Sequence, residues 1–157
     1  MSQLNNPLAN THADSAAYDI LYVQFIFHFN LTEDYFECHE VLEELWLETG
    51  RDPLYQGLLQ VAVALHHHHN DNFNGAIKLY QQAIDKLQHF PDVVLGIDLA
   101  EVLARSRVLH AKLLDAKGQF VPFENFKIMV LDPALQAAVD DWALQAELHG
   151  EGASHDD

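Results

Sequence analysis

The chain has 157 residues, and 49% of them are hydrophobic, which is enough apolar surface for one domain with a full core. It carries 24 acidic and 8 basic side chains, and the resulting net charge of −16 excludes nucleic acids and anionic membranes as expected partners. A cationic partner or a divalent metal ion suits this acidic field better. The only cysteine, Cys38, allows no intramolecular disulfide, and neither a signal peptide nor a membrane span is recognisable, so we expect a cytoplasmic location.

Helical periodicity accounts for most of the chain. The polar ends at 1–13 and 149–157 are predicted to be flexible tails, which leaves a helical bundle domain at 14–148. Caps and apolar spacing predict helices at about 14–30, 33–48, 53–70, 76–89, 91–117 and 132–148. Residues 120–130 lose this period and are predicted to form an extended strap over the bundle. The fold class is therefore all-α, a single-domain bundle of five to six helices with the third at its centre.

The helix predicted at 33–48 contains the segment YFECHEVLEELW. Thr32 is a good N-cap, and acidic residues follow it at the positive end of the helix dipole. A helical wheel places Cys38 and Trp46 on a buried apolar arc, with Glu37 and Glu44 on an acidic face in solvent.

His39 and Glu43 fall on neither face of this helix. They are one turn apart, with apolar residues on both sides, so both groups should be partly desolvated. Such a pair is a candidate for shifted pKa values or for a bound metal ion. A His–Glu hydrogen bond without any further role would also account for it.

The helix predicted at 53–70 is apolar almost all round except for one polar stripe. Gln56, Gln60 and His67 lie close together on the helical wheel, beside small residues that allow a neighbouring helix to approach. Because buried polar groups need partners, we expect the stripe to face His39 and Glu43 and to close a polar pocket between the two helices. His67 is then the one member of the run 66–69 that points into the pocket.

The quoted helix is followed by QGLLQVAVALHHHHNDNFNGA, and later by GIDL and VPFENFKI. These stretches, between about residues 19 and 130, resemble an uncharacterised helical family, a domain of unknown function whose members are often labelled predicted metal-dependent hydrolases. The resemblance implies an all-helical bundle. The family pattern falls on Phe36, His39, Glu40, Glu43, Trp46, Gln56, Gly57, Gln60, Asn72, Gly75 and Ala76.

The hydrolase label follows from a likeness to zinc protease helices, in which two histidines one turn apart bind the metal and a glutamate acts as general base. Here Glu43 takes the place of the second histidine. With His39, Glu43 and His67 as ligands of one zinc-like divalent ion, Glu40 would be the catalytic base. Gln60 would then orient the bound water or a substrate.

The sequence thus leaves three functions open, and with them the question of whether the protein is an enzyme. The first is metal-dependent hydrolysis. The second is a metal-free pocket, with Gln56 and Gln60 among its ligand-binding groups, for a small polar or cationic ligand. The third is a protein-interaction module whose buried His, Glu and Gln side chains are structural and whose acidic surface binds a protein partner.

Overall fold

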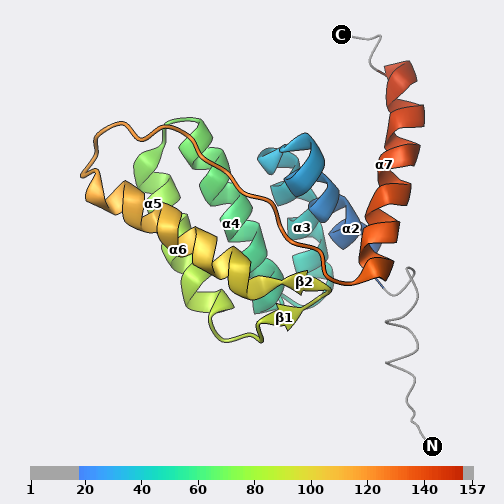
Figure 1. Cartoon of the computed structure of the whole chain (residues 1–157), viewed down its shortest axis with the longest axis horizontal. Coiled ribbons are helices and arrows are strands. Elements are labelled where there is room, and N and C mark those ends of the chain that lie inside the picture. The colour runs from blue at the N-terminus through green and yellow to red at the C-terminus, as the bar shows by residue number, and fades with distance from the viewer. Residues whose placement is uncertain (1–17, 154–157) are drawn as a thin grey trace, which may run out of the picture.

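The computed structural model describes residues 18–153, with side chains described as far as His149. It confirms an all-α, single-domain bundle, as Figure 1 shows. The elements are α2 (Ile20–Phe27), the π-helical turn η2 (His28–Thr32), α3 (Tyr35–Glu48), α4 (Pro53–His69), α5 (Phe73–Leu87), β1 (Val93–Val94), β2 (Ile97–Asp98), α6 (Leu99–Asp115) and α7 (Pro133–Ala153). The tail predicted at 1–13 lies outside the described residues, and α7 continues into the tail predicted at 149–157.

Aspartate side chains cap most of these helices. A carboxylate that accepts a hydrogen bond from a free N–H of the first turn stabilises a helix start by about 1 kcal/mol. This role is taken by Asp19, Asp34, Asp52, Asp98 and Asp132, while Asn72 caps α5. The start predicted for the second helix was therefore wrong by two residues, since Asp34 and not Thr32 is its N-cap. The Thr32 hydroxyl instead donates back to the His28 carbonyl.

The structure also corrects the helix predicted from Pro91. Val93 and Val94 form a short antiparallel hairpin with 97–98. Leu95 and Gly96 connect the strands with φ values of 56° and 74°. Two successive left-handed residues make the tight turn that matches strand twist, and β-branched valines favour the extended conformation before it. As a result α6 begins only at Leu99.

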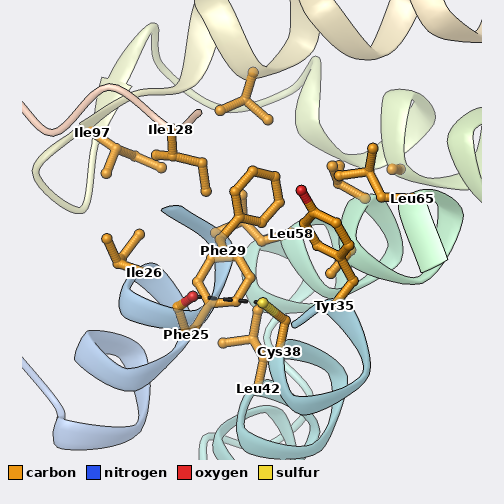
Figure 2. Close-up of a cluster of buried hydrophobic side chains, with 14 of the residues drawn as sticks. Phe25, Ile26, Phe29, Tyr35, Cys38, Leu42, Leu58, Leu65, Ile97 and Ile128 are labelled. Carbon is orange, nitrogen blue, oxygen red and sulfur yellow. Dashed lines mark hydrogen bonds between the residues drawn. The ribbon is translucent and has the colours of Figure 1, made fainter. Parts of the chain in front are cut away.

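The core lies where α4 packs between α3 and α5 and where α2 covers α3. Figure 2 shows the aromatic part of this core, in which the Phe29 ring contacts the rings of Phe25 and Tyr35 at centroid distances of 5.8 and 5.4 Å. The buried Cys38 thiol lies beside them and donates to the Phe25 carbonyl at 3.7 Å. This packing fixes the first half of α3 against the bundle.

Two side chains of α3 differ in their burial. Cys38 is fully buried, as predicted, but Trp46 is only partly buried, and the Arg51 guanidinium lies 5.0 Å from its ring centroid. On the acidic face Glu44 is exposed and Glu37 is half-buried. The wheel predicted the core side of this helix well and its last turn less well.

The predicted strap is present between α6 and α7 and crosses the bundle, as Figure 1 shows. His68 Nε2 donates to the Val121 carbonyl at 2.9 Å, and Asn125 donates to the Tyr35 hydroxyl at 3.0 Å. Asn30 binds both the N–H and the carbonyl of Ile128 at 2.8 Å. The strap is thus tied to α4, α3 and η2 in turn. None of the helices described in residues 18–153 is long and apolar enough to cross a membrane.

Candidate functional site

A cavity of about 200 Å³ opens between the first half of α3 and the second half of α4. It lies among residues that the sequence indicated, since His39 and His67 both line it. The full lining is Tyr35, Phe36, His39, Val63, His66 and His67. The predicted meeting of polar groups from these two helices is therefore present in part.

His39 is held by two carboxylates of its own helix. Its Nε2 atom lies 3.1 Å from Oε1 of Glu43, and its Nδ1 atom lies 3.5 Å from Oε2 of Glu40. The exposed side-chain fractions are 33%, 45% and 51% for His39, Glu43 and Glu40, so solvent screens these pairs. A pair one turn apart, such as His39 and Glu43, stabilises a helix by roughly 0.2–0.5 kcal/mol. Their main effect is to fix the orientation of the imidazole at the edge of the cavity.

His67 is oriented by the turn that follows α4. Asn72 Oδ1 accepts the hydrogen bond of the Gly75 N–H, so its amide nitrogen is directed to His67 Nδ1 at 3.2 Å. Because an amide NH₂ can only donate, Nδ1 of His67 must be the acceptor and Nε2 carries the ring proton. Burial, followed by the nearby imidazole of His66, holds the pKa of His67 below its usual 6.5. The ring is therefore neutral at pH 7.

Gln60 does not reach this cavity, contrary to the prediction that it converges there with His39, Glu43 and His67. Its Nε2 atom donates to Oε1 of Gln82 on α5 at 2.9 Å. One turn earlier, a Cβ on Gly57 would lie 2.6 Å from a methyl carbon of Leu87. Gln60 and Gly57 therefore lie on the side of α4 that packs closely against α5, and Gln56 is half-buried. The helical wheel gave the direction of Gln60 but not the identity of its neighbour.

The donor set does not fit a zinc ion. Among residues 18–149, no three His, Cys, Asp or Glu side chains are grouped so that they could hold a metal. A metal-binding histidine normally donates its second ring N–H to an oxygen, whereas His67 accepts a hydrogen bond from Asn72 at that atom. The nitrogen that remains, Nε2, carries a proton instead of a free lone pair.

A second hollow of about 360 Å³ adjoins the first one. It lies between η2, the start of α3 and the end of α4, and its lining is Thr32, Glu33, Asp34, Tyr35, Phe36, His66, His69 and Asn70. We call the two hollows together the α3–α4 groove. Phe36 belongs to both hollows, is 54% exposed, and has the rings of His39 and His66 at centroid distances of 6.3 and 5.9 Å.

Sequence reasoning missed the outer hollow and the part that Phe36 takes in the groove, because it followed polar residues into the core. The signal was an aromatic residue, Phe36, on the acidic side of an amphipathic helix. Single exposed apolar side chains are common on protein surfaces, so Phe36 is distinguished by its position between two hollows and not by its exposure alone.

Comparison with known proteins agrees with the family resemblance but adds no activity. The chain is 41% identical over 101 residues to the uncharacterised protein YpuF of Bacillus subtilis (strain 168), a match that covers 61% of this chain and 58% of that protein. It is 33% identical over 76 residues to an uncharacterised protein of Aquifex aeolicus (strain VF5), which covers 46% and 23% of the two chains. The matches thus span less than two thirds of these relatives.

No solved structure matches this chain. Residues 22–79 match the family model described as a domain of unknown function, DUF309. That segment contains α3 and α4, and therefore both hollows of the α3–α4 groove lie within the part of the chain that matches DUF309.

Proposed function

We propose that the chain is a protein-interaction module and that the α3–α4 groove binds a basic segment of a partner protein. The inner hollow, about 200 Å³, is smaller than the roughly 300–1,000 Å³ typical of small-molecule sites and has room for one apolar side chain. The outer hollow would hold the neighbouring residues of the same segment. The observation that carries the proposal is the exposed Phe36 ring between the two hollows.

Phe36 has the chemistry of an interface anchor. Aromatic side chains are enriched at protein interfaces because they cover much apolar area and lose little conformational entropy on binding. With 54% of Phe36 exposed, a partner side chain that covers the ring removes this area from water. The half-buried rings of His39 and His66 flank the same place and extend the surface available for contact.

The charges around the groove favour a basic partner. Glu33 and Asp34 line the outer hollow, and Glu40 and Glu43 lie beside His39 at the inner one. Lys127 offsets part of this charge through its 2.7 Å contact with Glu33. The His67 ring is neutral at pH 7, so it adds no positive charge to the groove. An arginine- or lysine-rich segment would therefore complement the groove.

Metal analysis tests the alternative interpretation, that the protein is a metal-dependent hydrolase. We expect tag-free protein to contain well below one equivalent of zinc, because the donor set at His39 and His67 does not fit the ion. One equivalent of zinc that is lost in both His39→Ala and His67→Ala would contradict this and restore the metal-dependent reading. Gln60→Leu serves as the control, since its amide bonds to α5.

The interaction is tested with a fluorescein-labelled peptide of ten residues that alternates arginine and serine around one central phenylalanine. Fluorescence anisotropy should show binding that weakens with salt, because exposed charges contribute to it. Phe36→Ala should weaken binding about tenfold, or roughly 1.4 kcal/mol. The matched control is Leu47→Ala, which also removes a half-exposed apolar side chain from α3, but at the far end of the helix.

Two results would refute the proposal. One is equal binding of the same peptide with glutamate in place of arginine, since the acidic groove should reject it. The other is a loss of affinity in Leu47→Ala as large as the loss in Phe36→Ala. The double variant Glu40→Gln, Glu43→Gln should reduce the salt dependence without removing the contact to Phe36.

A further inference from the structure

A larger cavity, of about 690 Å³, lies at one end of the bundle. Figure 1 shows the place, where the β1–β2 hairpin lies beside the start of α7. It shares no residue with the α3–α4 groove. Its lining comes from the start of α2, the first turn of α4, the hairpin and the residues before α7: Tyr18, Asp19, Tyr22, Tyr55, Val93, Val94, Leu95, Gly96, Leu131 and Asp132. This volume falls within the range of small-molecule sites.

Three tyrosines form a row along this cavity. The ring centroids of Tyr18 and Tyr22 are 6.1 Å apart, and those of Tyr22 and Tyr55 are 6.2 Å apart. Two of the hydroxyls are anchored, because Tyr22 donates to the Leu95 carbonyl at 2.8 Å and Tyr18 donates to Asp132 Oδ2 at 2.5 Å. With their hydroxyls held in this way, the rings form fixed parts of the cavity wall.

The hairpin turn closes one side of the cavity and leaves no room for another side chain. Gly96 has a φ of 74°, and a Cβ there would lie 2.7 Å from the Tyr18 hydroxyl and 3.1 Å from the Asp132 Cβ. The Gly96 carbonyl accepts the backbone N–H of both Leu131 and Asp132, at 2.8 and 3.1 Å. The wall therefore depends on a defined turn and not on a loose surface loop.

The electrostatic character of the cavity is negative. The described residues that line it include two carboxylates, Asp19 and Asp132, and no lysine, arginine or histidine. Burial first, and then the carboxylates of Asp52 and Asp19, raise the pKa of Tyr55, while burial and Asp132 raise that of Tyr18 to about 12. The phenols thus stay neutral at pH 7. Neutral aromatic faces beside carboxylates are the usual recognition surface for organic cations.

We propose that this cavity binds a small organic cation that has an apolar ring, with its ammonium group beside Asp19 and Asp132 and its ring against the half-buried Tyr18 and Tyr55, between which the buried Tyr22 ring lies. Asp19 already accepts the backbone N–H of Leu21, and Asp132 accepts both the Ala134 N–H and the Tyr18 hydroxyl. A carboxylate offers about four lone-pair positions, so Asp19 can accept a hydrogen bond from the ammonium group, and the negative charge of Asp132 adds to the attraction. The exposed Val93 and Leu131 supply apolar contacts near the opening. This site is independent of the function proposed for the α3–α4 groove.

Three probes with one skeleton separate charge recognition from apolar binding: phenethylamine, phenethyl alcohol and phenylacetate. Each is titrated into the full chain while backbone amide shifts are followed by NMR. We expect phenethylamine to shift the amides of Tyr22, Leu95 and Gly96. The neutral alcohol should bind at least fivefold more weakly, and phenylacetate should not bind.

Asparagine variants test the two carboxylates without removing a helix cap, because Asn and Asp cap helices equally well. Asp19→Asn and Asp132→Asn should each reduce the affinity for phenethylamine at least threefold and leave that for the alcohol unchanged. The matched control, Asp34→Asn, makes the same exchange at the cap of α3 and should have no effect. Tyr55→Leu should weaken both probes.

The proposal is overturned if phenethyl alcohol binds as tightly as the amine, or if Asp34→Asn weakens amine binding as much as Asp19→Asn. Absence of shifts at Tyr22, Leu95 and Gly96 at millimolar amine would overturn it as well. Asp34 also lines the α3–α4 groove, so a variant that loses peptide binding but keeps amine binding would separate the two sites.

Discussion

The side-chain amide of Asn72 makes two hydrogen bonds, one through its oxygen and one through its nitrogen. Its oxygen caps α5, and its nitrogen sets the tautomer of His67. Asn72→Asp keeps a good cap but removes the donor. We therefore expect the His67 ring proton to move to Nδ1 and the pKa of His67 to rise towards or above its usual 6.5, as measured by ring nitrogen NMR.

Asn74→Asp is the matched control, because Asn74 is an exposed residue in the first turn of the same helix. It adds the same charge without touching the imidazole of His67. If the ring proton of His67 stays on Nε2 in Asn72→Asp, some other group orients the ring.

Cys38 offers a second test at the residue scale. Its side chain is completely buried, its Sγ donates to the Phe25 carbonyl, and burial raises its pKa far above the usual value. Because thiol reagents attack the exposed thiolate, the native protein should react only as fast as it unfolds. Absorbance with a coloured disulfide reagent measures this, and rapid labelling without denaturant would contradict the packing shown in Figure 2.

Which single residues could be predicted depended on how many helices surround them. Cys38 lies in the middle of an apolar arc, so any packing of α3 buries it. Gln60 lies on α4, which has neighbours on two sides, and a helical wheel cannot decide whether α3 or α5 receives its side chain. The pairing of His67 with Asn72 depends on a cap outside the helix, which no periodicity reveals.

At the scale of helices, Gly57 sets how closely α4 approaches α5. Alanine is a better helix former than glycine by about 1 kcal/mol, but its Cβ would lie 2.6 Å from a carbon of Leu87, which is only 1% exposed. Overpacking of a buried contact costs roughly 1–3 kcal/mol, so we expect a net loss of stability of about 1 kcal/mol in Gly57→Ala.

Urea unfolding of Gly57→Ala, Leu87→Ala and the double variant measures this effect. If the contact is the cause, the two losses should not add, because Leu87→Ala makes room for the new methyl group. Additive losses, or a stabilised Gly57→Ala, would show that the two helices can separate without cost.

The order and type of the long helices followed from caps and periodicity, and the strap followed from its lack of periodicity. The predicted helix starts were wrong at two places, where a residue typical of a helix start is followed by residues with positive φ. Pro91 is a typical helix start, yet Leu95 and Gly96 adopt positive φ and make a hairpin. Thr32 is a good cap by type, but Glu33 takes a left-handed φ of 55° after η2 and shifts the cap to Asp34. Residue type alone does not encode such turns.

For the whole molecule, we predict a loss of stability as the pH falls. His28, His67 and His110 all have pKa values below 6.5 in the folded state, chiefly because of burial. The unfolded chain therefore binds more protons in this range, and the free energy of unfolding rises with pH. The contribution of these histidines to the free energy of unfolding is fully present above about pH 6.5, and it is lost as the pH falls towards their lowered pKa values in the folded state.

Urea unfolding at pH values between about 5.5 and 7.5 measures the slope. His28→Gln should flatten it, since burial of His28 outweighs the opposing effect of Glu37 and Asp34 on its pKa. His89→Gln is the control, because His89 is exposed. A slope of opposite sign, or one that His28→Gln leaves unchanged, would contradict the assignment.

The strap described above also has a consequence for the order of folding. Its hydrogen bonds join residues far apart in the chain: Asn125 lies 90 positions from Tyr35, and Ile128 lies 98 positions from Asn30. Contacts with such separations require closure of a long loop, so they form after the local contacts of α3, α4 and α5. Until then the Phe29 ring lacks its cover, the Phe126 ring 5.5 Å away. A newly made chain should therefore pass through a stage with exposed core aromatics, when it is most prone to aggregate.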